Sequence, residues 1–276
     1  MPELPEVETV RRQLAQSLIG KRVALIEKVE PAMLRDCTEG QVWEFLPGSR
    51  IEGVERLGKF LVLPLSETRF LTLHLGMTGN ILVSAEPPEA WGPHARFVLR
   101  LDDEAGRRSV LEFRDMRKFG RLHLTVGAPA PRLENLGPDA WQGTWDTQYL
   151  GDRIRGRTAP LKAFLLDQRN LAGIGNIYAD EILWWTRLSP LRQAGTLTAA
   201  EVAALAAEIP LRLGEGVRLL GCSISDFVDT EGRFGSFQEW LRAYGKQGQE
   251  CSRCGAVLAR VVVAGRGTAY CPGCQR

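Results

Sequence analysis

Apolar residues in the first eighteen positions follow a helical repeat. They recur at spacings of three and four residues, with polar and charged residues between them, at Val7, Val10, Leu14 and Leu18. Pro5 stands where the first helical residue is expected, and acidic residues surround it, as helix N-termini favour. The pattern predicts a helix that starts near Pro5 and buries one face.

Beyond residue 20 the hydrophobic pattern changes to that of β-strands. Short apolar or alternating runs are separated by Gly and Pro, and they span residues 23–26, 60–63, 70–75, 80–83, 97–101 and 110–113. Their spacing predicts an antiparallel sandwich or barrel rather than alternating βαβ units. The sequence Gly-Ala-Pro-Ala-Pro at 127–131 predicts the end of this domain.

From about residue 133 the period becomes helical. Helical patterns cover residues 159–167, 177–186 and 199–219, and Pro210 is expected to break or kink the last of them. A Gly-rich loop at 221–235 and a short helix near 237–241 follow. The expected fold is therefore α+β, with an N-terminal β-sandwich over 1–127, a helical domain over 133–245 and a small cysteine module over 246–276.

The cysteine module predicts a zinc site. Cys251 and Cys254 form one CxxC pair, Cys271 and Cys274 form a second, and sixteen residues separate the pairs. Four thiolates at this spacing are typical of a closed tetrahedral structural zinc site. Two strands, at 257–263 and 268–270, are expected between the pairs, with Arg266 at the tip of their hairpin. We expect one structural Zn²⁺ and no organic cofactor.

Composition and charge narrow the class of protein. The 276 residues are 44% hydrophobic and 25% charged, as in ordinary globular proteins, and two domains are expected at this length. No apolar run is long enough to span a bilayer and the N-terminus lacks a secretory signal, so a cytoplasmic protein is expected. The net charge is only +2, but residues 246–276 carry five cations and one acid. This basic module indicates a surface that faces a polyanion.

The N-terminal sequence Met-Pro-Glu-Leu-Pro-Glu carries candidate chemistry. Removal of Met1 would leave the secondary amine of Pro2 as the chain terminus, and an amine can attack a carbonyl carbon to form a covalent iminium. Glu3 and Glu6 lie within one helical turn and offer carboxyl groups for proton transfer. A capped helix start is the ordinary interpretation of the same residues, and both interpretations can hold together.

Three turn-forming segments carry further candidate residues. Residues 73–79 and 114–121 place Met77 and Phe119 at strand ends, where side chains are expected to be exposed, and Arg117 and Lys118 lie beside Phe119. Exposed apolar residues flanked by cations are typical of proteins that enter a base stack, although core packing is the ordinary alternative. Residues 171–177 contain two glycines before Asn176, which we expect to cap the following helix and to form a phosphate-binding helix start.

Taken together, these segments resemble the formamidopyrimidine-DNA glycosylase family. The resemblance covers Pro2 to Gln275 and rests on six segments in order, namely 2–8, 58–60, 74–77, 115–121, 173–181 and the four-cysteine ribbon. It implies a helix-two-turn-helix fold for the helical domain and a base-recognition loop between residues 222 and 244. Cys222 departs from the family pattern, because glycine or another small residue is usual at that position.

The resemblance implies a bifunctional glycosylase and lyase of base-excision repair. Pro2 would attack C1′ of the damaged nucleotide, Glu3 would donate the proton that opens the sugar, and Glu6 matches an acidic position near the site. Lys59 matches the lysine assigned to β-elimination and Arg266 the arginine assigned to δ-elimination. The expected partner is damaged double-stranded DNA, bound by a monomer that is associated with a bacterial nucleoid and does not bind membranes.

The resemblance also implies a set of DNA contacts. Met77, Arg117 and Phe119 match the triad that fills the vacated space and reads the opposite cytosine, and Lys162 matches a lysine near the damaged base. Residues expected to contact DNA are His74, Met77, His94, Arg117, Phe119, Arg157, Lys162, Asn176 and Tyr244. The preferred substrate implied is an oxidised purine, 8-oxoguanine opposite cytosine or a formamidopyrimidine.

Two other functions are compatible with parts of the sequence. The endonuclease VIII branch shares the fold and the nucleophile but prefers oxidised pyrimidines; Leu4, the triad and the long segment from Cys222 to Tyr244 favour the formamidopyrimidine branch. A non-enzymatic zinc-ribbon DNA-binding protein would leave Glu3 and Lys59 without a role.

Overall fold

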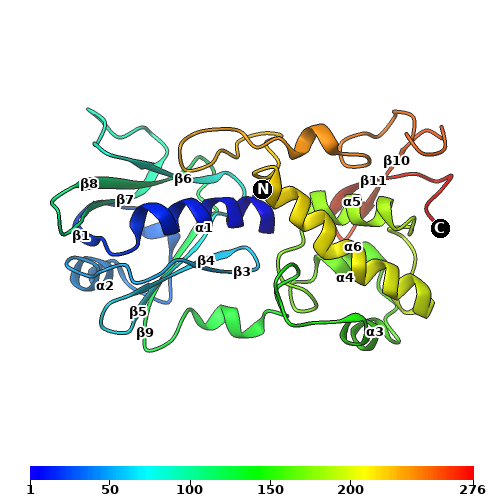
Figure 1. Cartoon of the computed structure of the whole chain (residues 1–276), viewed down its shortest axis with the longest axis horizontal. Helices are drawn as coiled ribbons and strands as arrows, with labels where there is room; N and C mark the ends of the chain where they lie inside the picture. Colours follow the sequence, from blue (N-terminus) through cyan, green and yellow to red (C-terminus); the bar gives the residue numbers. More distant parts are fainter. The chain divides into compact units, whose positions relative to one another are not determined.

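In the computed structural model, which describes residues 1–276, helix α1 spans Leu4–Leu18 (Figure 1). Pro5 lies in its first turn, and the four apolar residues of the predicted stripe are fully buried. The helix packs against β3 and β4 of one sheet and against β6 of another. The predicted N-terminal helix is confirmed, and its apolar face joins two sheets into one core.

The two sheets are almost entirely antiparallel. The four-stranded sheet has the order β1 (Arg22–Val29), β7 (Ala95–Asp102), β8 (Arg108–Asp115) and β6 (Gly79–Ser84). The five-stranded sheet has the order β2 (Leu34–Arg35), β9 (Arg121–Val126), β5 (Arg69–His74), β4 (Phe60–Leu65) and β3 (Glu55–Leu57). Only β2 and β9 pair in parallel. Leucine, isoleucine and phenylalanine side chains from both sheets share one buried cluster with α1, which confirms the predicted sandwich.

Strand β9 lies outside the runs expected from the sequence. Its residues alternate between polar and apolar, with Leu122 and Leu124 buried, which is the pattern of a strand with one face in the core. His123 is also buried, and its Nδ1 lies 2.8 Å from Oδ2 of Asp36. Because side chains alternate along a strand, His123 faces the side of the sheet opposite Leu122 and Leu124, and its ring nitrogen is paired there with the exposed Asp36. The short helix α2 (Glu39–Phe45), capped by Thr38, and the 3₁₀ turns η1 (Pro31–Met33) and η2 (Pro131–Asn135) complete this region.

The second half of the chain is helical. It contains α3 (Thr147–Ile154), α4 (Leu161–Leu166), α5 (Asn176–Trp185) and α6 (Ala199–Arg218), with the 3₁₀ turns η3 (Ala194–Thr196) and η4 (Phe237–Trp240). Helix α6 confirms the helix predicted over 199–219, and it continues through Pro210 without ending there. The hairpin of β10 (Ala259–Val263) and β11 (Arg266–Tyr270) follows. The α+β class is thus confirmed, and no helix is both long and apolar enough to cross a bilayer.

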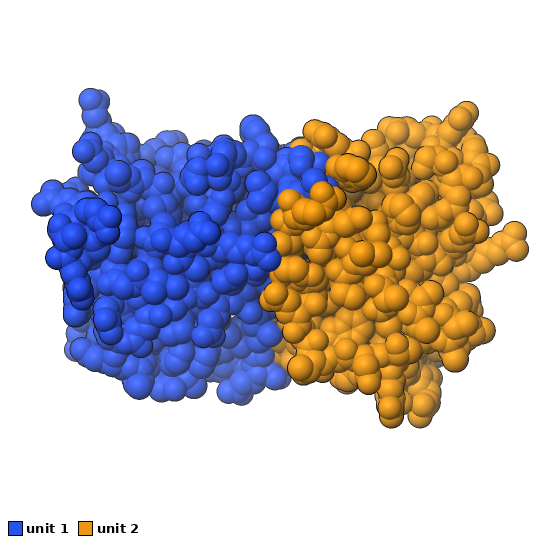
Figure 2. Space-filling view, in the orientation of Figure 1, with its two compact units in different colours: residues 1–135, 219–236 blue, residues 136–218, 237–276 orange.

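The chain forms two units that are not continuous in sequence. Unit 1 comprises Met1–Asn135 and Leu219–Ser236, and unit 2 comprises Leu136–Arg218 and Phe237–Arg276 (Figure 2). The segment Leu219–Ser236 follows α6 and belongs to unit 1, where it forms hydrogen bonds with strand β6. Asn80 accepts a hydrogen bond from Val228 N, and Val83 N donates to Thr230 O, so this segment covers the edge strand β6.

Candidate active site and zinc centre

The start of α1 places three predicted catalytic residues together in unit 1. Glu3 is the N-cap residue, and its N–H donates to Oε2 of Glu6 at 2.7 Å, as in a capping box. Both carboxyl groups are about 1% exposed, and Pro2 is also buried. The helix start thus fixes two acidic side chains within one turn of the proline.

Glu6 also holds the segment that follows α6. Its Oε1 accepts a 2.7 Å hydrogen bond from the backbone N–H of Cys222. Gly221 has a φ of +84°, and a Cβ at that position would lie 2.8 Å from Cγ of Glu6. Only glycine fits this close approach in this backbone conformation. The base of the expected recognition loop is therefore bonded to an acidic residue of the expected catalytic helix.

Lys59 lies in the hairpin turn that joins β3 to β4. Leu57 pairs with Phe60, so the turn has two central residues, and Gly58 supplies the positive φ that a type II′ turn requires at its first position. Arg56 of β3 bonds to the carbonyl oxygen of Gly58 at 3.1 Å and to Oε2 of Glu8 on α1 at 2.9 Å. The turn that carries Lys59 is thereby connected to the helix that carries Pro2.

Glu8 is a buried anion with three arginine partners. Burial raises the pKa of Glu8, but hydrogen bonds from Arg11, Arg56 and Arg12 outweigh it and hold the pKa below its ordinary value. The carboxylate is therefore charged at neutral pH, and its link to Arg56 is a charge-assisted hydrogen bond.

His74 at the end of β5 is neutral at physiological pH. Its Nδ1 accepts a hydrogen bond from the N–H of Gly76 at 3.1 Å, and its ring packs against Phe60 with centroids 4.7 Å apart. Burial lowers the pKa of His74 to about 4, and the nearby charges of Lys59 and Arg132 add to the effect. The neutral imidazole thus shapes the turn that presents Met77.

The carboxylate of Asp115 joins the two loops that carry the expected wedge residues. It is fully buried and accepts hydrogen bonds from the hydroxyl of Thr78, from Arg117 N and from Gly120 N, the last at 2.6 Å. A Cβ at Gly76 would lie 2.5 Å from the carbonyl carbon of Phe119, so the loops touch at backbone distance. One buried anion therefore sets the relative position of residues 74–79 and 115–120.

The side chains of the expected triad point outward from these loops. Phe119 is 43% exposed, Met77 is half-buried, and the guanidinium carbon of Arg117 lies 4.8 Å from the Phe119 ring centroid. His94 is also exposed. It lies close to these loops, because its carbonyl oxygen accepts a hydrogen bond from Asp115 N at 2.9 Å. The structure therefore brings together the backbone segments that carry these four residues, and it places the Arg117 and Phe119 side chains in contact.

Unit 2 gathers a second group around the β10–β11 hairpin. A cavity of about 280 Å³ is lined by Asn176, Tyr244, Arg260 and Thr268, among others. Helix α5 begins at Asn176 with Gly175 as its N-cap, so the expected cap by Asn176 is wrong. The amide of Asn176 instead donates to the carbonyl oxygen of Gly267 at 3.1 Å, because β11 lies against the helix start.

The remaining predicted residues of unit 2 differ in exposure. Arg157 is exposed after α3, with its backbone carbonyl bonded to Gly195 N. Lys162 is fully buried in α4, and its Nζ lies 2.6 Å from Oδ1 of Asp180. Burial raises the pKa of Asp180 to about 6, although Lys162 opposes the shift. Arg266 is exposed at the start of β11.

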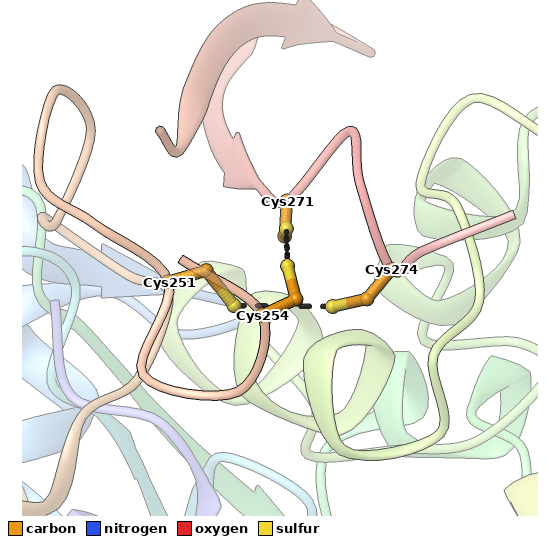
Figure 3. A group of neighbouring side chains, drawn as sticks. All are labelled: Cys251, Cys254, Cys271 and Cys274. Atoms are coloured by element: carbon orange, nitrogen blue, oxygen red, sulfur yellow. Dashed lines mark hydrogen bonds between the residues drawn. The ribbon is translucent and has the colours of Figure 1, made fainter. Parts of the chain in front are cut away.

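The four cysteines of the ribbon converge in unit 2. All four sulfurs lie within 4.8 Å of one another, with 3.8 Å between Cys251 and Cys274 and 3.4 Å between Cys254 and Cys271 (Figure 3). A tetrahedral site with Zn–S bonds of about 2.3 Å places its sulfurs about 3.8 Å apart. The four thiolates therefore fit one zinc ion, which they would hold with no position left for substrate.

The ribbon is fixed to the helices by residues beside the cysteines. Arg253 donates to the carbonyl oxygen of Trp184 at 2.8 Å, and its guanidinium carbon lies 3.7 Å from the Trp184 ring centroid. Gln275 accepts from Cys271 N and donates to Leu188 O. These contacts connect the zinc site to α5.

Sequence reasoning missed the buried acids that hold these loops. Asp115, Glu181 and Asp180 look like ordinary surface residues in the sequence, yet each is at most 2% exposed. Glu181 accepts from the N–H groups of Arg242, Ala243 and Tyr244, so it fixes the turn that carries Tyr244. A sequence signal exists only for Asp115, an Asp that ends a strand and precedes a Gly-containing turn.

The lowered pKa of His74 predicts a pH dependence of stability. The unfolded chain binds a proton at His74 near pH 6.5, whereas the folded chain binds it only near pH 4. Between these two values the unfolded chain binds more protons than the folded chain. The free energy of unfolding is therefore highest above pH 6.5 and decreases as the pH falls from 6.5 to about 4. His74→Asn should flatten the dependence of the free energy of unfolding, measured with urea, between these values. The matched control His94→Asn should follow the unsubstituted protein; a curve identical to that of His74→Asn would contradict the prediction.

The ribbon geometry predicts that loss of one cysteine removes the metal. Cys254→Ser should lower the zinc content from one ion per chain to none, because three thiolates cannot close the tetrahedron. DNA binding should be lost while the circular dichroism of the β-sandwich persists. Cys37→Ser, which changes a half-buried thiol of unit 1, should retain zinc. Purified protein with no zinc and intact DNA binding would contradict the prediction.

Comparison with known proteins identifies the family. Residues 1–122 match the sequence model of the formamidopyrimidine-DNA glycosylase N-terminal domain, residues 136–228 match its H2TH domain, and residues 248–276 match the zinc finger found in FPG and IleRS. The chain is 42% identical to a formamidopyrimidine-DNA glycosylase of Chloroflexus aggregans, over 100% of this chain and 98% of that protein. It is 38% identical to one of Bacillus cereus, over 100% and 99% of the two chains.

Solved structures agree with the sequence comparison. A mutant of Lactococcus lactis FPG bound to Fapy-dG DNA superposes with a TM-score of 0.91 at 33% identity, covering all of both chains. A MutM complex with carbocyclic 8-oxo-G DNA also gives a TM-score of 0.91, at 34% identity and over 100% of both chains. The zinc finger match and the four converging cysteines establish a structural zinc site. The chain belongs to the formamidopyrimidine-DNA glycosylase family.

Proposed function

We propose that the protein removes oxidised purines from DNA through an iminium on Pro2 and then cleaves the strand by β,δ-elimination. The observation that carries the proposal is the start of α1, where Pro2 directly precedes the buried capping box of Glu3 and Glu6. Glycosylases of this family act on damaged DNA, and the related structures hold Fapy-dG and 8-oxo-G DNA.

The proposed first stage exchanges one bond to C1′ for another. The Pro2 nitrogen forms a bond to C1′ and loses its proton, while the glycosidic bond breaks and its electron pair leaves with the base, which takes up one proton. Glu3 donates a proton to O4′ as the sugar ring opens, and an iminium between Pro2 and C1′ results. Both acids are held by backbone hydrogen bonds, which keeps their positions fixed relative to the amine.

The proposed second stage uses the acidity that the iminium gives to the sugar. Loss of the C2′ proton breaks the bond from C3′ to its phosphate oxygen, and Lys59 is assigned to this β-elimination. Loss of the C4′ proton then breaks the bond from C5′ to its phosphate oxygen, and Arg266 is assigned to this δ-elimination. Water finally releases the sugar fragment from Pro2. Lys59, Asn176, Tyr244 and Arg266 are proposed to bind the flanking phosphates.

The proposed recognition step requires extrusion of the damaged nucleotide. Extrusion loses stacking worth a few kcal/mol, which an inserted apolar wedge and phosphate contacts offset. Met77 and Phe119 are the proposed wedge, and Arg117 is proposed to read the orphaned cytosine. The exposure of Phe119 beside the Arg117 guanidinium supports this assignment. His74, His94, Arg157 and Lys162 remain proposed members of the DNA-binding set.

The nucleophile is tested by borohydride trapping. Reduction should link the enzyme covalently to lesion DNA, and peptide mapping should place the adduct on Pro2. Glu3→Gln should lose base release but still cleave a pre-formed abasic site, because that substrate has no glycosidic bond to break. An adduct on Lys59, or full activity with a blocked N-terminus, would refute the assignment.

The role of Arg117 is tested through the opposite base. Its guanidinium can donate to the acceptor edge of cytosine but meets donors on adenine, and bidentate contacts of this kind discriminate by about 1–3 kcal/mol, or roughly tenfold to a hundredfold. Arg117→Ala should lower the rate of base release. It should also bring the rates measured opposite cytosine and opposite adenine closer together. Lys118→Ala is the matched control, since this neighbouring cation pairs with Glu30 at 2.9 Å.

A lesion panel separates the two enzymatic branches. Two duplexes of the same sequence are compared, one with 8-oxoguanine and one with an oxidised pyrimidine. The protein should cut the duplex that carries 8-oxoguanine faster. Faster cleavage of the oxidised pyrimidine would replace this proposal with an endonuclease VIII-like activity.

A further inference from the structure

Lys162 and Asp180 form an ion pair that has no access to solvent. The Lys162 side chain is 0% exposed, that of Asp180 is 1% exposed, and the two charged groups are 2.6 Å apart. Lysine is almost never fully buried unless it is paired, and an apolar pair of similar volume is often as stable or more stable. General packing therefore does not account for this pair, and its remaining contacts indicate another role.

Lys162 makes two hydrogen bonds to the strand that begins with Arg266. Nζ of Lys162 donates to the hydroxyl of Thr268 at 2.8 Å and to the carbonyl oxygen of Gly267 at 3.2 Å. The same Thr268 hydroxyl donates to the carbonyl oxygen of Arg266 at 3.1 Å. A continuous series of polar contacts thus runs from Asp180 through Lys162 and Thr268 to the backbone of Arg266.

Asp180 makes a second contact with the same strand. Its Oδ2 accepts a hydrogen bond from Ala269 N at 3.1 Å, so its two oxygens serve Lys162 and β11 separately. Lys162 belongs to α4 and Asp180 to α5, and both helices pack together in unit 2. The strand is therefore bonded to two helices at Gly267, Thr268 and Ala269, the three residues that follow Arg266.

The exposed tip of the hairpin has little other support. Ala264 and Gly265 both have positive φ, and Val262 is 68% exposed. Arg266 itself is exposed and has no ion pair in the structure. The zinc ligand Cys271 lies five residues away, at the other end of β11. The four cysteines thus fix one end of the strand, and near Arg266 the strand is bonded by the buried pair and by the Asn176 amide, which donates to Gly267 O.

We propose that Asp180, acting through Lys162 and Thr268, is a positioning residue for Arg266. This inference rests on the proposed function, in which Arg266 serves δ-elimination. In this role Lys162 acts beneath the hairpin, through its hydrogen bonds to Thr268 and Gly267. A displacement of a reacting group by ~1 Å can cost ~10²-fold in rate, so a small shift of the strand suffices to impair one step.

The test separates β- from δ-elimination on a duplex with a pre-formed abasic site opposite cytosine. The two steps leave different 3′ ends, an unsaturated aldehyde and a phosphate, which denaturing gels resolve. Asp180→Asn keeps the side-chain volume but removes the charge and one acceptor. It should leave borohydride trapping and zinc content unchanged and lower the δ-elimination rate by about tenfold or more.

A double substitution distinguishes positioning from general stability. Arg266→Ala should abolish most δ-elimination, and Asp180→Asn combined with Arg266→Ala should be no slower in that step than Arg266→Ala alone. Independent effects that multiply would overturn the proposal. The matched control is Glu201→Gln, which removes another paired carboxylate of unit 2, one bonded to Arg192, and should leave the product ratio unchanged.

Thr268→Val provides a variant of nearly equal shape. It removes only the hydroxyl that joins Lys162 to Arg266, and it should also lower the δ-elimination rate with trapping unchanged. An unaltered product ratio in Thr268→Val, or an equal loss of trapping and δ-elimination in Asp180→Asn, would refute the positioning role. If the unsubstituted protein neither traps nor cleaves, the proposed function fails instead, and the two failures are distinguishable.

Discussion

Buried carboxylates that accept backbone N–H groups hold the functional loops of this protein. Glu6 accepts from Cys222, Asp115 accepts from Arg117 and Gly120, and Glu181 accepts from the turn at 242–244. A hydrogen bond to a charged group contributes about 1.5–3 kcal/mol, and its loss leaves a buried charge unsatisfied. Burial raises the pKa of Glu181 while these N–H groups oppose the shift, so the loop and the acid depend on each other.

These hydrogen bonds to buried carboxylates explain how loops outside the sheets hold reactive side chains in fixed positions. Each acid lies on or next to a regular element, α1, β8 or α5, whose position is set by apolar packing. The acid transfers that fixed position to a loop through directional hydrogen bonds, one from the loop to Glu6, two to Asp115 and three to Glu181. Gly76 and Gly221 permit the close backbone approach that the bonds require, because a Cβ at either position would overlap its neighbour.

In the ribbon, a metal site and buried polar contacts together hold the loops. Four thiolates hold the two CxxC turns, and Arg253 and Gln275 connect these turns to α5 and to the residues that follow it. The hairpin beyond the metal is bonded to α4 and α5 through Lys162 and Asp180. Metal and ion pair thus fix different parts of one short strand, which the small apolar core of the ribbon would not fix alone.

The sequence alone determined the parts that depend on local pattern. The apolar repeat of α1, the alternating runs of most strands, the spacing of the four cysteines and the order of the six family segments are all local, so helix, sandwich, zinc site and family could be predicted. The helix over 199–219 was predicted and is confirmed as α6, which continues through Pro210 because the surrounding packing outweighs the cost of an internal proline. Strand β9 was not among the predicted runs, although its residues alternate between polar and apolar.

Only the tertiary structure decided which polar residues are buried and what they bond to. Nothing in the sequence distinguishes Asp180 or Glu181 from solvated acids, since their partners lie up to 89 residues away along the chain. The same holds for Lys162, which the resemblance places near the base and the structure places beneath the hairpin of Arg266. Hydropathy records the cost of burying a charge, whereas only the folded chain supplies the partner that offsets that cost.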